Sequence, residues 1–153
     1  MAFGSYYIVL DFDGTVVKHA YPAVGEDVGA VPILKRLVAN GCKLLLCTMR
    51  SRNSEGEDTL QPALDWFEER GLPLFGINEN PTQKEWTSSP KVYGQVYIDD
   101  AALGAPLAFD DQGSAYIDWN QAAAYLYYMG LLTQTDLIEL VDEGAVELEL
   151  KKK

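Results

Sequence analysis

Two carboxylates separated by one residue follow a short apolar run near the start of the chain. The run is Tyr6–Leu10, and Asp11 and Asp13 come directly after it, with Gly14 and Thr15 next. Carboxylates held this close repel each other, so they need a proton, a cation or a strong hydrogen-bond donor beside them. The segment therefore predicts a site that binds a cation or moves protons.

Other polar residues come at the ends of later apolar runs. Thr48 follows one run, Asp99 and Asp100 follow another, and Lys91 lies eight residues before Asp99. The carboxyl ends of parallel strands meet at one edge of a sheet, so we expect these groups to converge. Several carboxylates at one edge favour a hard divalent cation, with Mg²⁺ the first choice. A threonine and a lysine beside them would donate to an anion such as phosphate.

The hydrophobic pattern gives the elements that must position these groups. Strands are predicted over 6–10, 42–47, 74–77 and 95–98, a further edge strand over 115–118, and helices over 30–40, 59–70, 119–129 and 133–142. Alternating strands and helices predict an α/β fold with a mostly parallel central sheet covered on both faces by helices. We expect one Rossmann-like domain over residues 1–153, with a core over about 6–130 and a C-terminal helix and tail over 131–153.

The motif set resembles the haloacid dehalogenase (HAD) superfamily over roughly residues 6–119. The resemblance lies in the segment Asp11-Phe12-Asp13-Gly14-Thr15, followed in order by Thr48, Lys91 and the pair Asp99-Asp100. HAD dehalogenases lack the second aspartate of the first motif, so the resemblance favours phosphoryl chemistry. It implies a Mg²⁺-dependent phosphatase or phosphotransferase.

The resemblance also implies a role for each motif residue. Asp11 would attack phosphorus and form an aspartyl-phosphate, and Asp13 would protonate the leaving group and then activate water. Thr48 would donate to the phosphoryl group, and Lys91, or alternatively Lys84, would neutralise its charge. Asp11, the carbonyl of Asp13, and Asp99 would hold Mg²⁺, with Asp100 nearby or acting through water. The neighbouring residues expected to contact substrate are Gly14, Thr15, Met49 and Arg50.

The spacing of the motifs leaves no room for an inserted cap domain. Asp13 to Thr48 and Thr48 to Lys91 each hold only loops, one helix and one strand. An open site predicts a phosphorylated small molecule or a phosphorylated macromolecule as substrate. His19, the only histidine, is either a surface residue or a substrate contact from the loop after the first motif.

Two other protein classes fit parts of the pattern. A HAD-fold metal- or phosphate-binding regulatory protein with weak turnover is the alternative to an enzyme. A response-regulator receiver also combines aspartates, threonine and lysine on a parallel sheet. It would need an aspartate after the third strand, which Leu74–Ile77 lacks.

Composition limits the partners. The 153 residues carry a net charge of −11, which disfavours nucleic acid and anionic membrane surfaces. No apolar run is long enough to span a membrane, and residues 1–5 lack the pattern of a signal peptide. Cys42 and Cys47 are predicted to be buried, reduced thiols, which suggests the cytoplasm. An open site and aromatic C-terminal helices are compatible with a homo-oligomer.

Overall fold

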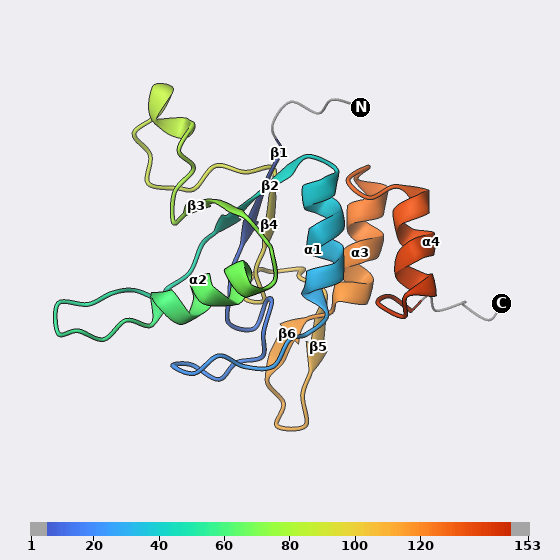
Figure 1. The fold of residues 1–153 in the computed structure, drawn as a ribbon, viewed down its shortest axis with the longest axis horizontal. Coiled ribbons are helices and arrows are strands. Elements are labelled where there is room, and N and C mark those ends of the chain that lie inside the picture. Colours follow the sequence, from blue (N-terminus) through green and yellow to red (C-terminus); the bar gives the residue numbers. More distant parts are fainter. Residues whose placement is uncertain (1–5, 148–153) are drawn as a thin grey trace.

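Four parallel strands carry the residues on which the predicted site depends (Figure 1). The computed structural model describes residues 6–147, and the basic run 151–153 lies outside that part of the chain. The strands are β1 (Tyr6–Leu10), β2 (Cys42–Leu46), β3 (Leu74–Ile77) and β4 (Val96–Ile98). Their order across the sheet is β3-β2-β1-β4, and every neighbouring pair is parallel. The carboxyl ends of β1 and β4 are therefore neighbours.

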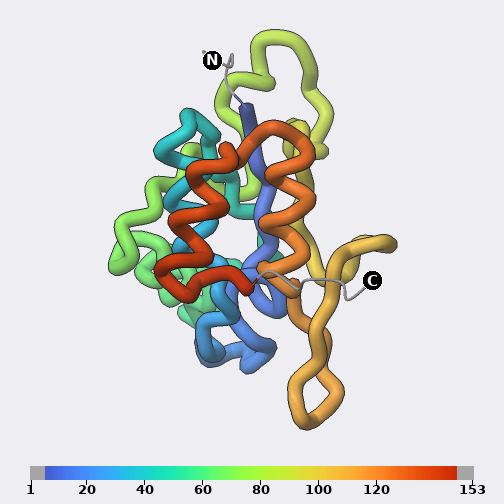
Figure 2. Tube along the Cα trace, turned by 90° about the vertical axis from the view of Figure 1, so that its right-hand side faces the viewer, coloured from blue at the N-terminus to red at the C-terminus, as the bar shows by residue number. Residues whose placement is uncertain are grey.

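Four helices connect and follow these strands. They are α1 (Ala30–Ala39), α2 (Leu60–Glu69), α3 (Trp119–Tyr128) and α4 (Gln134–Asp142). Helix α4 begins at a capping box, in which Thr133 and Asp136 each bond the other's backbone N–H. Figure 2 shows α3 and α4 side by side, and both also contact α1. The predicted α/β fold is confirmed.

The two faces of the sheet are covered differently. Ile8 and Leu10 of β1 belong to the main hydrophobic core, to which all four helices contribute side chains. Alternate residues of a strand point to opposite faces, so Tyr7 and Val9 lie on the other face. There they pack with Val92 from the long segment between β3 and β4. The expectation of helices on both faces is corrected, because this segment contains only a short 3₁₀ turn (Gln83–Glu85).

A small antiparallel hairpin follows the main sheet. It pairs β5 (Leu107–Phe109) with β6 (Ala115–Ile117) and extends beyond the carboxyl ends of the main strands (Figure 1). The sequence predicts the β6 segment as a further edge strand. Among the described residues, β6 pairs instead with β5, a strand that the sequence pattern does not predict. Three residues are too few to give a period-two signal. The segments between the motifs hold no separate cap domain in the described part of the chain, as predicted.

Two further expectations can be compared with the described residues. None of the described helices combines the length and the hydrophobicity needed to cross a lipid bilayer. Cys42 is buried, as expected, but Cys47 is exposed because it follows β2 at the open edge of the sheet. The prediction that both thiols are buried was therefore wrong for Cys47.

Candidate functional site

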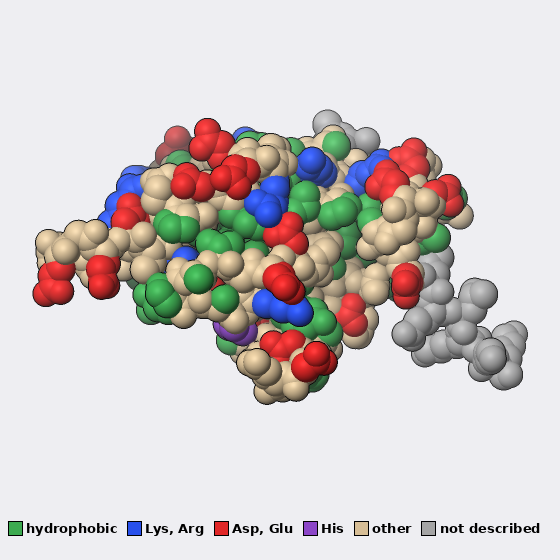
Figure 3. Space-filling model, turned by 60° about the horizontal axis from the view of Figure 1, so that its bottom comes forward, with side chains coloured by type: hydrophobic (Ala, Val, Ile, Leu, Met, Phe, Trp, Pro, Cys, Tyr) green, Lys and Arg blue, Asp and Glu red, His purple; other side chains and the backbone are tan. Residues whose placement is uncertain are grey.

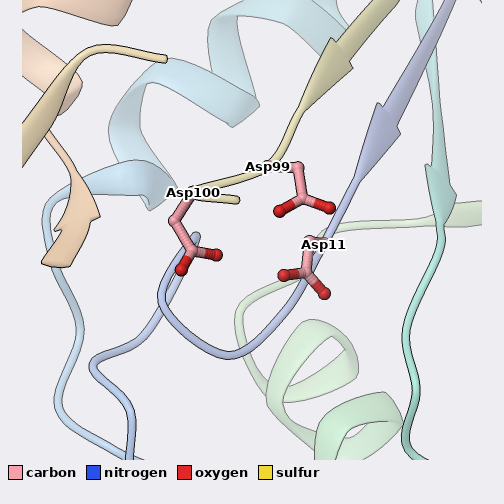
Figure 4. A group of neighbouring side chains, drawn as sticks. All are labelled: Asp11, Asp99 and Asp100. Atoms are coloured by element: carbon pink, nitrogen blue, oxygen red, sulfur yellow. The ribbon is translucent and has the colours of Figure 1, made fainter. Parts of the chain in front are cut away.

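Three carboxylates meet at the carboxyl edge of the sheet. Asp11 follows β1, and Asp99 and Asp100 follow β4, its hydrogen-bonded neighbour. One oxygen from each of the three lies within 4.8 Å of the others. Figure 4 shows the three side chains directed into the same space. The parallel pairing of β1 and β4 thus brings together residues that are almost ninety positions apart in the sequence.

The electrostatic state of Asp11 is unusual for a carboxyl group. The pKa of Asp11 is raised to about 7, chiefly by burial and also by the neighbouring carboxylates Asp99 and Asp100, against a backbone hydrogen bond that lowers it. Partial burial, together with the carboxylates of Asp11 and Asp99, also raises the pKa of the Cys47 thiol. Among the described residues, no lysine forms an ion pair with the three carboxylates. Apart from His19, which lies beside Asp100, the described residues therefore offer these three carboxylates no basic partner.

The Asp100 side chain is held by two residues from the segment after β1. The hydroxyl of Thr15 donates to Asp100 Oδ1 over 3.2 Å, and His19 Nε2 lies 2.9 Å from Asp100 Oδ2. Gly14 has a φ of +78°, and an added Cβ there would meet His19 and Asp100 at 2.2 and 2.6 Å. Only glycine therefore leaves room for this contact. Thr15 is fully buried, so it can position Asp100 but cannot reach a substrate. The predicted contact of Thr15 with substrate is therefore corrected.

Asp13 is separated from the other carboxylates by its bonding. Its Oδ2 and Oδ1 accept from Nε and Nη2 of Arg50 at 2.8 and 2.7 Å. Arg50 is only 1 % exposed, and its donors are directed at Asp13 and at backbone carbonyls, so the predicted substrate contact by Arg50 is corrected. The Asp13 carboxylate does not belong to the three-carboxylate group. The metal ligand predicted from Asp13 is its backbone carbonyl, so the position of its side chain leaves that prediction untested.

Thr48 lies at the same edge, after β2. Its Oγ1 accepts from the backbone N–H of Arg50, and its own N–H donates to the side chain of Asn78. Asn78 has a φ of 52° at the end of β3, a left-handed conformation that asparagine adopts more readily than most residues. No motif or spacing in the sequence points to Asn78. Its amide links the end of β3 to the loop that carries Thr48.

The structure does not bring the predicted lysine to the carboxylates. The Lys91 amine lies 5.5 Å from the centre of the Tyr97 ring, and the alternative, Lys84, pairs with Glu79. Lys91 precedes β4 whereas Asp99 follows it, so the strand separates the two residues. The prediction of Lys91 beside the carboxylates is wrong, because a residue that precedes β4 lies toward its amino end and not its carboxyl end.

The surface around the site carries both acidic and apolar side chains. Figure 3 shows this face, with red and green side chains interspersed and the single histidine at the surface. Met49 is 96 % exposed and can contact a ligand, as predicted. The His19 side chain is 45 % exposed while its ring nitrogen faces Asp100. The exposed side chain agrees with the first alternative for His19, a surface residue, while the second, a contact with substrate, stays a prediction.

The three-carboxylate group has the chemistry of a divalent-cation site. All its donors are hard carboxylate oxygens, which suit Mg²⁺ or a similar ion and not a soft metal. Besides burial, repulsion from Asp99 and Asp100 raises the pKa of Asp11, and a bound cation would offset that repulsion. Asp100 is also held by side-chain hydrogen bonds, as ligating carboxylates commonly are. The residues present therefore fit a divalent cation.

Comparison with known proteins supports the fold. The chain matches no family model and no curated protein. A solved structure, that of a conserved protein coded by a locus from Bacteroides thetaiotaomicron, is 29% identical with a TM-score of 0.63. The match covers 88% of this chain and 98% of that chain. Its description specifies no activity, so the chemistry of the site depends on the residues described above.

Proposed function

We propose that the protein is a HAD-like, divalent-cation-dependent phosphatase that acts on a phosphate ester through an aspartyl-phosphate. The observation that carries this proposal is the convergence of Asp11, Asp99 and Asp100 at one edge of the sheet. Mg²⁺ is the proposed cofactor, and the substrate is a phosphorylated small molecule or macromolecule. The free cysteines Cys42 and Cys47 suit a reducing compartment such as the cytoplasm.

Asp11 supplies the nucleophile in this mechanism. One carboxylate oxygen attacks phosphorus, the bond to the leaving oxygen breaks, and the alcohol departs with a proton that Asp13 supplies. Water then attacks the aspartyl-phosphate, gives its proton back to Asp13 and releases inorganic phosphate. Thr48, in the loop after β2, would bind the phosphoryl oxygens. A bound cation would offset the charge of the carboxylates and of the phosphoryl group.

One observation favours the alternative of a binding or regulatory protein with weak turnover. Both oxygens of Asp13 already accept hydrogen bonds from a buried guanidinium, and no lysine of the described residues pairs with the carboxylates. Proton transfer and charge neutralisation therefore have less support than cation binding. Turnover is what separates the two functions.

The decisive experiment measures phosphate release from p-nitrophenyl phosphate and from a panel of phosphate esters, with Mg²⁺ and with EDTA. We expect release that depends on Mg²⁺ and falls about 10⁴-fold or more in Asp11→Asn, because the nucleophile is lost. Vanadate, which mimics the pentacoordinate transition state of phosphoryl transfer, should inhibit phosphate release.

A matched control is Asp111→Asn, a carboxylate of the exposed β5–β6 turn, which should leave the rate unchanged. If purified wild-type protein binds Mg²⁺ but releases no phosphate from any ester of the panel, the binding protein is the better description. If Asp11→Asn retains the wild-type rate, the observed activity belongs to a contaminant.

A further inference from the structure

The guanidinium of Arg50 connects three segments that are distant in the sequence. It donates two hydrogen bonds to Asp13, in the loop after β1. Nη1 also donates to the carbonyls of Pro22 and Thr59, over 3.1 and 3.0 Å, and Nη2 donates to that of Ala23 over 2.7 Å. A guanidinium has five N–H donors, so every donor of Arg50 is used within the protein.

The surroundings of Arg50 make this arrangement difficult to change. The side chain is 1 % exposed, and its central carbon lies 5.0 Å and 5.2 Å from the ring centres of Phe12 and Tyr21. Arginine stays protonated in proteins, so the buried charge requires a carboxylate beside it. Asp13 is its only ion-pair partner among the described residues. Lysine could supply the charge but not the planar fork of donors.

The loop over residues 18–28 is held in part by these bonds and in part by Asp27, which accepts hydrogen bonds from Trp66 and Arg70. It contains no helix or strand, and its carbonyls at Pro22 and Ala23 point to Arg50. Nearer its start, His19 faces Asp100 of the three-carboxylate group. The loop is thus held at one place by Arg50 and at another by a residue of the candidate cation site.

We propose that Arg50 is a positioning residue that fixes Asp13 and the loop 18–28 beside the carboxylates. In a chain without a cap domain, this loop then forms a fixed wall of the site. The effect on turnover depends on the proposed phosphatase function, whereas the effect on the loop does not. A consequence follows for Asp13: replacing it removes a proton carrier and also leaves the charge of Arg50 unpaired.

Hydrogen–deuterium exchange of the whole chain tests the loop without any need for activity. Arg50→Lys keeps the charge and loses the fork, so amides of 18–28 should exchange about tenfold faster or more, while those of α3 stay unchanged. Arg52→Lys is the matched control, because Arg52 lies two residues away and is mostly exposed, paired with Asp58. Unchanged exchange in 18–28, or an equal rise throughout α3, would overturn the inference.

A second variant guards against misfolding of Arg50→Lys. Tyr21→Leu removes one ring beside the guanidinium and leaves the buried ion pair intact. We expect the same local increase in exchange over 18–28, of smaller size. Wild-type exchange over 18–28 in folded Tyr21→Leu would show that the packing around Arg50 does not hold the loop, and would count against the proposal.

Turnover provides a readout that a purely structural role would not give. For p-nitrophenyl phosphate, kcat of Arg50→Ala should fall about 10²-fold with little change in KM, because groups are misplaced and not lost. Added guanidinium ion should restore part of kcat in Arg50→Ala and none in Asp11→Asn. Folded Arg50→Ala with wild-type kcat, or without rescue, would contradict positioning. If wild-type protein has no phosphatase activity, the proposed function fails and the exchange experiment still decides the role of Arg50.

Discussion

Two groups of charged residues lie close together at the carboxyl edge of the sheet, and they are balanced in opposite ways. The Arg50–Asp13 pair matches a buried cation with a carboxylate, and both side chains have hydrogen-bond partners. The group of Asp11, Asp99 and Asp100 places like charges together, with His19 as its only basic partner among the described residues. The charges of the Arg50–Asp13 pair balance each other, whereas those of the three-carboxylate group do not.

The difference indicates which group belongs to a ligand. A buried charge that is fully paired gains nothing from a further ion, and its loss damages the fold. Carboxylates that repel one another are stabilised by whatever positive charge arrives, so they gain from a bound cation. We therefore expect substitutions in the pair to change stability first, and substitutions in the carboxylate group to change binding and pH dependence first.

Removing Arg50 should give the largest effect on stability. Arg50→Met leaves the Asp13 carboxylate and three carbonyls without their donors, so the free energy of unfolding should fall by about 3–5 kcal/mol. Chemical denaturation with EDTA present measures it. The control Arg52→Met should lower the same quantity by at most about 1 kcal/mol, because the ion pair of Arg52 is exposed. An equal fall in the free energy of unfolding for Arg50→Met and Arg52→Met would contradict the stabilising role of the buried pair.

The two arginines also illustrate how far the sequence can be interpreted. The apolar runs before Asp11 and before Asp99 predicted parallel strands, and strand pairing then brought these aspartates together as expected. Nothing local distinguishes Arg50 from Arg52, since both lie in one polar stretch. Their environments differ because the partners of Arg50 come from chain segments whose positions are set by tertiary packing.

The lysine prediction failed for a related reason. A motif order fixes which residues precede a strand, but it does not fix the path of the connecting chain. Here Val92, from the segment between β3 and β4, packs on the face of the sheet that carries Tyr7 and Val9. Its neighbour Lys91 lies near the Tyr97 ring and not near the carboxylates. In the same way, the backbone conformation at Asn78 depends on a contact with Thr48, which sequence spacing does not encode.

The carboxylate group should give a stability difference that depends on pH. The folded pKa of Asp11 is about 7, above the value of 3.8 for a free aspartate, so the folded state holds a proton that the unfolded state has released. Stability therefore falls as pH rises from about 4 to about 7 and is level above that. Asp11→Asn removes the titration, and its stability relative to wild type should rise by about 2 kcal/mol between about pH 5 and pH 8, after allowance for solvent screening.

Thermal unfolding in EDTA at the two pH values measures this difference, and Mg²⁺ supplies the control. At saturating Mg²⁺ and the higher pH, the wild type should regain stability, by about 2.7 kcal/mol at a hundred times Kd, while Asp11→Asn should gain much less. If the variant is more stable than the wild type by the same amount at both pH values, the pKa of Asp11 is not raised in the folded state. Stabilisation of both proteins alike by Mg²⁺ would place the ion elsewhere.

The smallest effect is expected at the boundary between the two groups, where His19 contacts Asp100 from the loop that Arg50 holds. His19→Leu removes the ring nitrogen that lies 2.9 Å from Asp100 Oδ2, so the carboxylate loses part of its orientation and Mg²⁺ affinity should fall about tenfold. His19→Gln can still donate from its amide and should lose less. Lys18→Met is the matched control, because Lys18 pairs with Glu26 and not with the carboxylates. Isothermal titration with Mg²⁺ measures all three variants, and an equal loss in Lys18→Met would mean that net charge, not the contact with Asp100, sets the affinity.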